Sequence, residues 1–322
     1  MGNHISRRRK TKNSSRDDSS TLDDPATKSL PDGTMSTYSQ PKFSTRPTMT
    51  AFPHNEAEGA RHQNSHYLLK HIFQSSYFAP VQQRLQEPGA TALDIGCGTN
   101  APWVVELAME FPNAEFHGID IVDPFDDEAS SVCIPKNIQF VRTSFLEGLH
   151  YEDEYFDFVH QRLMYGVYHG DDINWILREI KRLTKPDGWV ELVEADMVPK
   201  RAGPLFTKLL ETVHRAMRKR QKHFFHGPRV RRFLSENGFL DVKTDYGSIP
   251  VCWGGYVGKL MYENMLVILR HFGPIIYHDL DLTGDFREAH YDAFVDKAFD
   301  ECVEYQTFFN VHWACGRKPA VS

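Results

Sequence analysis

Short apolar runs alternate with longer amphipathic segments through the middle of this chain. The apolar runs predict strands at 91–95, 115–119, 138–142, 155–159 and 189–194, and two more at 240–246 and 308–315. Helical patterns separate most of the first five, most clearly at 101–111 and 171–184. Alternating strands and helices are typical of βαβ units, in which helices cover both faces of a parallel sheet. We therefore expect an α/β fold built on a mostly parallel sheet.

Helical patterns also lie outside this alternation. Residues 60–73 and 75–85 predict helices that pack ahead of the first strand, and about 255–305 predict helices rich in Met and aromatic residues. Apolar residues recur there at helical spacing, at Leu260, Met261, Met265, Leu266, Ile268, Leu269 and Phe272. Core packing explains this spacing, but Met-rich walls also suit a lid over an apolar small molecule.

The first 55 residues differ in composition from the rest. Ser, Thr, Pro, Asp and Lys are frequent, and Tyr38 and Phe43 are the only aromatic residues within 1–50, so we expect a disordered tail. The chain begins MGNHISRRRK, in which Gly2 and Ser6 fit the pattern for N-myristoylation. An acyl chain on Gly2 beside the basic cluster at 7–10 would form a two-signal peripheral membrane anchor. A basic, solvated tail with a nuclear-import role is the alternative.

Charge and cysteine usage limit the compartment and the partners. The net charge is −6, which gives no general attraction to nucleic acid. The five cysteines are scattered without a CxxC pair or a zinc-like spacing, so we expect reduced thiols and no metal site. No window holds 18 uninterrupted apolar residues, and no signal-peptide core lies near the start. We expect a cytoplasmic protein, peripheral on the cytoplasmic face of a membrane if Gly2 is acylated, with a nuclear location as the alternative.

The stretch TALDIGCGTNAPW at 91–103 contains the motif with the most chemical content. Gly96 and Gly98 follow the first strand and precede a helix, where a backbone without side chains can approach a ligand closely and a helix N-terminus can offer N–H groups to an anion. The second strand ends at Asp120, 22 residues after Gly98, where a carboxylate can accept hydrogen bonds from a ribose diol.

Two ligand classes compete for this turn. The spacing Gly96-x-Gly98-x-x-Ala101 formally fits the dinucleotide fingerprint, which would indicate NAD(P) or FAD. The acid at Asp94, two residues before the first glycine, favours S-adenosyl-L-methionine (S-adenosylmethionine) instead. A carboxylate there would face the ammonium group of that molecule, whereas it would repel a pyrophosphate.

Four segments then occur in an order and spacing that resemble a known family: ALDIGCGTN, FHGIDI, FDFVHQRLM and LREIKRLTKPDGWVELVE. The chain resembles class I S-adenosylmethionine-dependent methyltransferases, particularly fungal members, closely over about 60–200 and only in layout over 200–322. The resemblance implies a Rossmann-like three-layer sandwich whose seven-stranded, mostly parallel sheet has an antiparallel last strand. Residues 1–55 would then form the tail and 56–322 the methyltransferase domain, with a helical insertion at about 255–305 before that strand.

The resemblance also implies a set of cofactor-binding residues. Asp94, Gly96 and Gly98 would form the loop, Cys97 and Thr99 would contribute their backbone, and Asp120 would hold the ribose. The adenine would lie beside Ile121, Ser144 and Phe145, and the methionine end beside His160. The chain departs from the family at Asn100, often a glycine, and at Ser144, where many members carry Asp. Asn tolerates positive φ, so the turn can survive.

Methyl transfer from a sulfonium is an in-line displacement that mainly needs alignment and exclusion of water. No catalytic group is obligatory, but His160 is the best candidate for a base or an acceptor-orienting residue. Alternatively, His160 and Arg162 shape the cofactor cavity or pair with Glu191 or Glu194. Other polar side chains near the same strand ends are Tyr165, Tyr168, His169 and Asp196.

The sequence favours a small-molecule methyl acceptor, and a lipid-like one would suit the N-terminal anchor. Methylation of a protein and a cofactor-binding regulatory scaffold without turnover are the alternatives. The basic stretch at 214–232 could contact RNA, phosphorylated substrates or lipid headgroups, but a solvated helix face explains it as well in an acidic chain. We therefore predict no specific nucleic acid partner.

Overall fold

The computed structural model describes residues 55–125, 134–169, 172–222 and 226–320. All of these belong to one compact unit, Ser39–Ser322. The predictions of a disordered tail, of acylation on Gly2 and of a basic anchor therefore fall on residues outside the described ranges. Within those ranges, no helix combines the length and the apolar composition needed to cross a bilayer.

Seven strands in the described ranges form one sheet in the order β3-β2-β1-β4-β5-β7-β6. Their bounds are β1 (Thr91–Ile95), β2 (Glu115–Asp120), β3 (Ile138–Arg142), β4 (Phe156–Arg162), β5 (Thr184–Lys200), β6 (Leu240–Pro250) and β7 (Phe308–Arg317). The first five run parallel, and β7 is antiparallel to both β5 and β6. This confirms the predicted mixed sheet with an antiparallel last strand.

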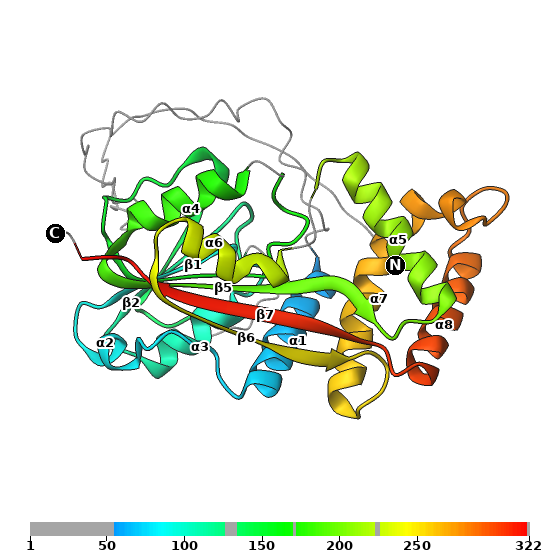
Figure 1. Cartoon of the computed structure of the whole chain (residues 1–322), viewed down its shortest axis with the longest axis horizontal. Helices are drawn as coiled ribbons and strands as arrows, with labels where there is room; N and C mark the ends of the chain where they lie inside the picture. Colours follow the sequence, from blue (N-terminus) through cyan, green and yellow to red (C-terminus); the bar gives the residue numbers. More distant parts are fainter. Residues whose placement is uncertain (1–54, 126–133, 170–171, 223–225, 321–322) are drawn as a thin grey trace, which may run out of the picture. The chain divides into compact units, whose positions relative to one another are not determined.

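Helices cover both faces of the sheet, as Figure 1 shows for α4 and α6 on one side and α2 and α3 on the other. The helices are α2 (Gln82–Gln86), α3 (Pro102–Glu110), α4 (Asp172–Leu183) and α6 (Val230–Glu236), with short 3₁₀ turns η1 (Phe145–Glu147) and η2 (Gly227–Arg229). Successive residues of β1 face opposite layers: Ala92 packs in the cluster of α3, and Leu93 in the cluster of α4. Because successive side chains of a strand point to opposite faces of the sheet, β1 contributes to two separate cores.

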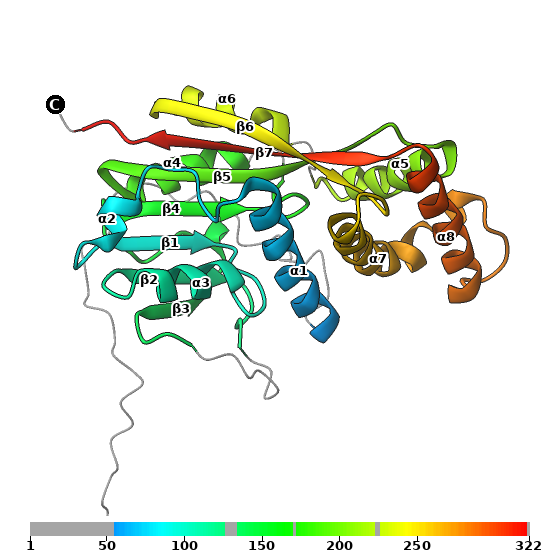
Figure 2. The same ribbon diagram turned by 90° about the horizontal axis from the view of Figure 1, so that it is seen from below.

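A third core lies where the long strands β5, β6 and β7 extend beyond the parallel part of the sheet (Figure 2). It is built by α1 (Glu56–Phe73), α5 (Pro204–Lys219), α7 (Tyr256–Ile276) and α8 (Glu288–Glu304), with η3 (His278–Leu280) between the last two. Helices α7 and α8 occupy the segment between β6 and β7, which confirms the predicted helical insertion before the last strand.

The sequence predicts that the fifth strand begins at 189, after the Pro186–Asp187–Gly188 segment. The structure places it inside β5 instead, which begins at Thr184 opposite Phe156. The pairing with β4 shifts register before Trp189, and Asp187 takes a φ of 60°. The backbone of this segment still pairs with Lys318, through Asp187 N–H and Gly188 C=O. The segment is therefore an irregularity within a strand, stabilised by its antiparallel neighbour.

Candidate functional site

The loop between β1 and α3 approaches two other segments too closely for side chains. Gly96 and Gly98 have φ values of +72° and +71°. A Cβ atom at Gly96 would lie 2.5 Å from Met164 Sδ, and one at Gly98 would lie 2.4 Å from His62 Nδ1. Asn100 has a φ of 62°, as its tolerance for that region predicted. Both glycines are thus required by geometry and by close packing.

The N–H groups of this loop are hydrogen-bonded within the protein. Gly96 and Cys97 donate to Ile119 O, and Asn100 donates to Pro124 O. Gly98 N–H donates to Asp120 Oδ2 at 2.9 Å, and Thr99 N–H donates to His62 Nδ1 at 2.9 Å. The helix then begins at Pro102, which has no N–H. The loop N–H groups are therefore already used, and the prediction that the N-terminus of α3 offers N–H groups to an anion stays a prediction.

A cavity of about 220 Å³ opens beside this loop, and we call it the loop cavity. Eight of the ten residues proposed to bind a cofactor line it: Gly96, Cys97, Gly98, Thr99, Asp120, Ile121, Ser144 and Phe145. Burial raises the pKa of the Asp120 carboxyl, while N–H groups of Gly98 and Val122 lower it. Asp120 is thus held by the loop that it faces, next to the partly apolar wall of Ile121 and Phe145.

Asp94 and His160 are not in the lining of the loop cavity. They form a row with Glu191 across three neighbouring strands, since Asp94 is paired in register with His160, and His160 with Glu191. His160 Nδ1 lies 2.9 Å from Asp94 Oδ1, and its ring stacks on Trp103 with 3.9 Å between centroids.

The chemistry of this row is that of a buried support. Asp94 and His160 are each about 1% exposed, and His160 Nε2 lies 3.8 Å from Glu191 Oε1. Burial lowers the pKa of His160, although Asp94 opposes this shift. A neutral ring then donates Nδ1–H to Asp94. This geometry does not bring His160 to a ligand, so it does not favour the predicted role of a base, nor a direct contact of Asp94 with an ammonium.

Arg162, at the end of β4, does line the loop cavity. Its NH1 nitrogen lies 3.1 Å from His66 Nδ1, and the other ring nitrogen of His66 lies 3.1 Å from Glu106 Oε2. Across the ranges that the structure describes, no carboxylate lies within ion-pair distance of Arg162 (the recorded pairs are all between other residues). A partly buried guanidinium without a carboxylate is costly unless a ligand supplies one. Arg162 is therefore a donor available to an anionic group in the loop cavity.

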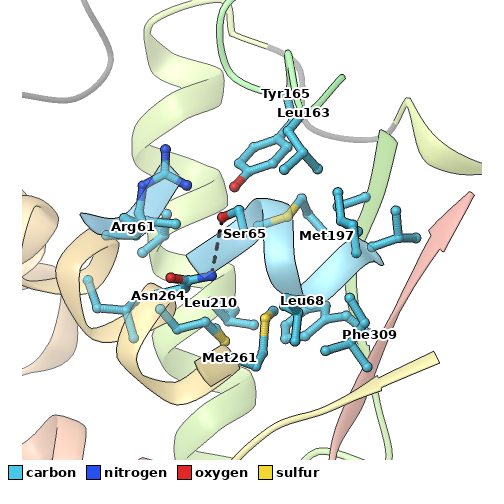
Figure 3. Close-up of a pocket in the computed structure, with 18 of the residues that line it drawn as sticks. Arg61, Ser65, Leu68, Leu163, Tyr165, Met197, Leu210, Met261, Asn264 and Phe309 are labelled. Carbon is cyan, nitrogen blue, oxygen red and sulfur yellow. Dashed lines mark hydrogen bonds between the residues drawn. The ribbon is translucent and has the colours of Figure 1, made fainter. Parts of the chain in front are cut away.

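A second cavity of about 70 Å³ adjoins the first, and we call it the helix pocket (Figure 3). Four residues line both cavities: Arg61, Ser65, Leu163 and Tyr165. The walls come mainly from apolar side chains of α1, α5 and α7, with strand residues such as Phe309 closing one side. An apolar space thus begins where the loop cavity ends.

The sequence pattern did not identify the contribution of α1. Glu58, Arg61, His62 and Ser65 all line the loop cavity, and Arg61 pairs with Glu58 at 2.6 Å. These residues recur at helical spacing and are polar, yet Glu58, Arg61 and Ser65 are under 9% exposed. A polar stripe on a helix that must pack against a sheet was the available signal.

Comparisons with known proteins agree with this geometry. Residues 92–188 match a family model described as a methyltransferase domain. The secondary metabolism regulator laeA of Coprinopsis cinerea is 24% identical over 83% of this chain and 69% of its own length. The N-methyltransferase verN of Clonostachys rogersoniana is 25% identical over 59% of this chain and 65% of its own length.

The chain is also similar to solved structures. Phosphoethanolamine N-methyltransferase 2 of Haemonchus contortus, in complex with S-adenosyl-L-methionine, has a TM-score of 0.45 and 18% identity. The match covers 80% of this chain and 52% of that one. The strand order described above already defines the fold without this likeness.

Proposed function

Because this chain contains a class I S-adenosylmethionine-dependent methyltransferase domain, we propose that it methylates a small, largely apolar acceptor. One observation carries the proposal: the helix pocket and the loop cavity share Arg61, Ser65, Leu163 and Tyr165. A small molecule in the pocket would therefore lie directly against a cofactor in the cavity. The apolar walls favour an acceptor with an apolar body.

The residues of the loop cavity fit the parts of S-adenosylmethionine. Arg162 would bind its carboxylate, because this guanidinium has no carboxylate partner among the described residues. Asp120 would accept hydrogen bonds from the ribose, and Ile121, Ser144 and Phe145 would flank the adenine. The loop from Gly96 to Thr99, including Cys97, would pass close to the amino-acid part.

When bound, S-adenosylmethionine would supply a methyl group on a positively charged sulfur; its transfer to the acceptor would leave the S–C electron pair on sulfur, and the methylated acceptor would release its proton to solvent on leaving the site. The protein's own residues would orient both molecules and keep bulk water out. Leu163 and Tyr165 line both cavities and would flank the point of transfer. We place Asp94 and His160 behind the loop as a positioning pair, rather than as groups that touch the acceptor.

Two measurements test this function. Calorimetric titration with S-adenosylhomocysteine should show binding to the full chain. Incubation with methyl-labelled cofactor and a protein-free cell extract should place label in small molecules. Label that appears only on proteins would support protein methylation instead, and binding without label in either fraction would support a regulatory scaffold.

The N-terminal prediction remains separate from the site. We propose that Gly2 is acylated and, together with the basic cluster at 7–10, gives peripheral membrane contact. This would bring the enzyme to lipid-like acceptors. Mass spectrometry of the N-terminal peptide decides it, because a free or acetylated Gly2 would contradict the proposal.

A further inference from the structure

One amide in the helix pocket has an unused hydrogen-bonding atom. Asn264, on α7, is 5% exposed and donates from Nδ2 to Ser65 Oγ at 3.2 Å (Figure 3). Its carbonyl oxygen Oδ1 is buried and receives no hydrogen bond from any described residue. Buried polar atoms are normally paired, and an unpaired one indicates a missing partner.

The position of this oxygen connects it to the proposed transfer. Ser65 lines both cavities, so the Asn264 amide is held beside their shared boundary. The other α7 residues that line the pocket are apolar, Met265, Leu269 and Phe272 among them. A ligand would thus meet hydrogen-bonding groups at the end nearest the cofactor and hydrocarbon at the other end.

The chemistry of the amide selects the ligand group. A carbonyl oxygen can only accept, so it needs an N–H or O–H from its partner. In the structure the amide nitrogen of Asn264 faces Ser65 Oγ, and Oδ1 is the atom without a partner. Arg61 at the same boundary is neutralised by Glu58, 2.6 Å away, so the pocket does not require an anionic acceptor.

We propose that Asn264 is a specificity-determining residue that binds the N–H or O–H of a neutral, otherwise apolar acceptor, at or next to the atom that is methylated. This inference rests on the proposed function and refines its substrate class. An apolar molecule of the same shape without a donor would leave the oxygen unpaired, which is the strongest kind of discrimination that a binding site offers.

Three probes of nearly identical shape test the donor requirement directly. Indole carries an N–H donor, benzofuran has an oxygen that can only accept, and indene has neither group. Their affinities are measured by calorimetry on the full chain, with and without saturating S-adenosylhomocysteine. Wild type should bind indole at least about tenfold more tightly than indene or benzofuran. Equal affinities, a preference for benzofuran, or no binding of indole would overturn the inference.

Variants locate the preference at Asn264. In Asn264→Leu the advantage of indole over indene should disappear, whereas Met261→Leu, a volume-conserving change in the same wall, should keep the ratio. A preference that survives in Asn264→Leu would assign it to another residue and overturn the inference. Titration of S-adenosylhomocysteine on the same proteins separates the two proposals, because cofactor binding that fails in wild type counts against the function itself.

Stability provides a second readout. Asn264→Leu removes an unpaired buried oxygen, so its Tm should rise by about 2–4 °C if the amide serves a ligand. A comparable fall in Tm would show that the amide stabilises the fold through Ser65, and would contradict a role in specificity.

Discussion

The loop cavity and the helix pocket adjoin each other, yet they are built by opposite means. The loop cavity lies at the ends of parallel strands and is lined by charged and polar groups such as Asp120 and Arg162. The helix pocket lies among helices from distant parts of the chain and is lined mostly by hydrocarbon. Hydrogen bonds and charge define what the first can hold, and shape defines most of what the second can hold.

Helix α1 links the two regions. Its His62 packs on the glycine loop, and its Ser65 bonds to Asn264 on α7, 199 residues away. His66 of the same helix supports Arg162 and contacts Glu106 on α3. A local motif at the strand ends therefore specifies the loop cavity. One helix from outside that motif, α1, joins this cavity to the helix pocket.

The largest effect should come from forcing α1 away from the loop. Gly98→Ala should lower the free energy of unfolding by about 2–5 kcal/mol, about 1–2 for the positive φ and about 1–3 for the contact with His62. Gly89 has a φ of +77° with no neighbour within 4 Å, so Gly89→Ala isolates the first part. Urea denaturation measures both. Equal losses in the two variants would mean that His62 does not press on Gly98.

Removing the Arg162 guanidinium from the loop cavity should have the next largest effect. Arg162→Leu should weaken binding of S-adenosylhomocysteine by about 100-fold, or about 2.8 kcal/mol, because a charge-assisted hydrogen bond is lost. The affinity of Arg162→Lys should lie between those of wild type and Arg162→Leu, because lysine keeps the charge without the planar fork. Calorimetry gives the affinities, with the exposed Arg178→Leu as control. An unchanged affinity in Arg162→Leu would place the carboxylate elsewhere.

The pH dependence of stability tests the environment of Glu194, near the boundary between the loop cavity and the helix pocket. Its Oε1 accepts a hydrogen bond from Met164 N–H at 2.9 Å. Leu163 and Tyr165, on either side of Met164, line both cavities. Burial raises the pKa of Glu194 to about 8 from 4.5, against N–H groups of Met164 and Tyr165 that lower it. The folded protein therefore holds a proton that the unfolded chain releases, and stability falls as pH rises between about 4.5 and 8.

Glu194→Gln should remove this decline while keeping the acceptor for Met164. Between pH 5 and 8 the variant should lose about 2 kcal/mol less unfolding free energy than wild type. Urea denaturation at pH 5, 6.5 and 8 measures the difference, with the exposed Glu211→Gln as control. Parallel pH curves for wild type and Glu194→Gln would show that Glu194 is ionised in the folded protein.

The smallest effect should come from Asp120. Asp120→Ala should weaken S-adenosylhomocysteine about tenfold, or about 1.4 kcal/mol, through loss of a charged hydrogen-bond acceptor. The nearby exposed Asp123→Ala should leave the affinity unchanged and so controls for the loss of negative charge alone. The same titrations serve for both. Equal affinities in wild type and Asp120→Ala would remove Asp120 from the site.

Local patterns predicted much of the fold. The strands at 91–95 and 138–142 match β1 and β3 residue for residue, because each carries its apolar run directly in the sequence. The Pro186–Asp187–Gly188 segment, which the sequence placed before the fifth strand, shows the limit of such patterns. Its residue types favour a turn, but pairing with Lys318 from the far end of the chain keeps the backbone in β5.

The site divides along the same line. Residues close in the chain predicted the strands of the motif, the glycine loop and the position of Asp120, since these depend on backbone sterics and local patterns. Only the tertiary structure decided that Asp94 turns to His160, that Asp120 and His62 occupy the loop N–H groups, and that Ser65 meets Asn264. Those contacts join segments 22 to 199 residues apart, where the choice of partner depends on how whole helices and strands pack.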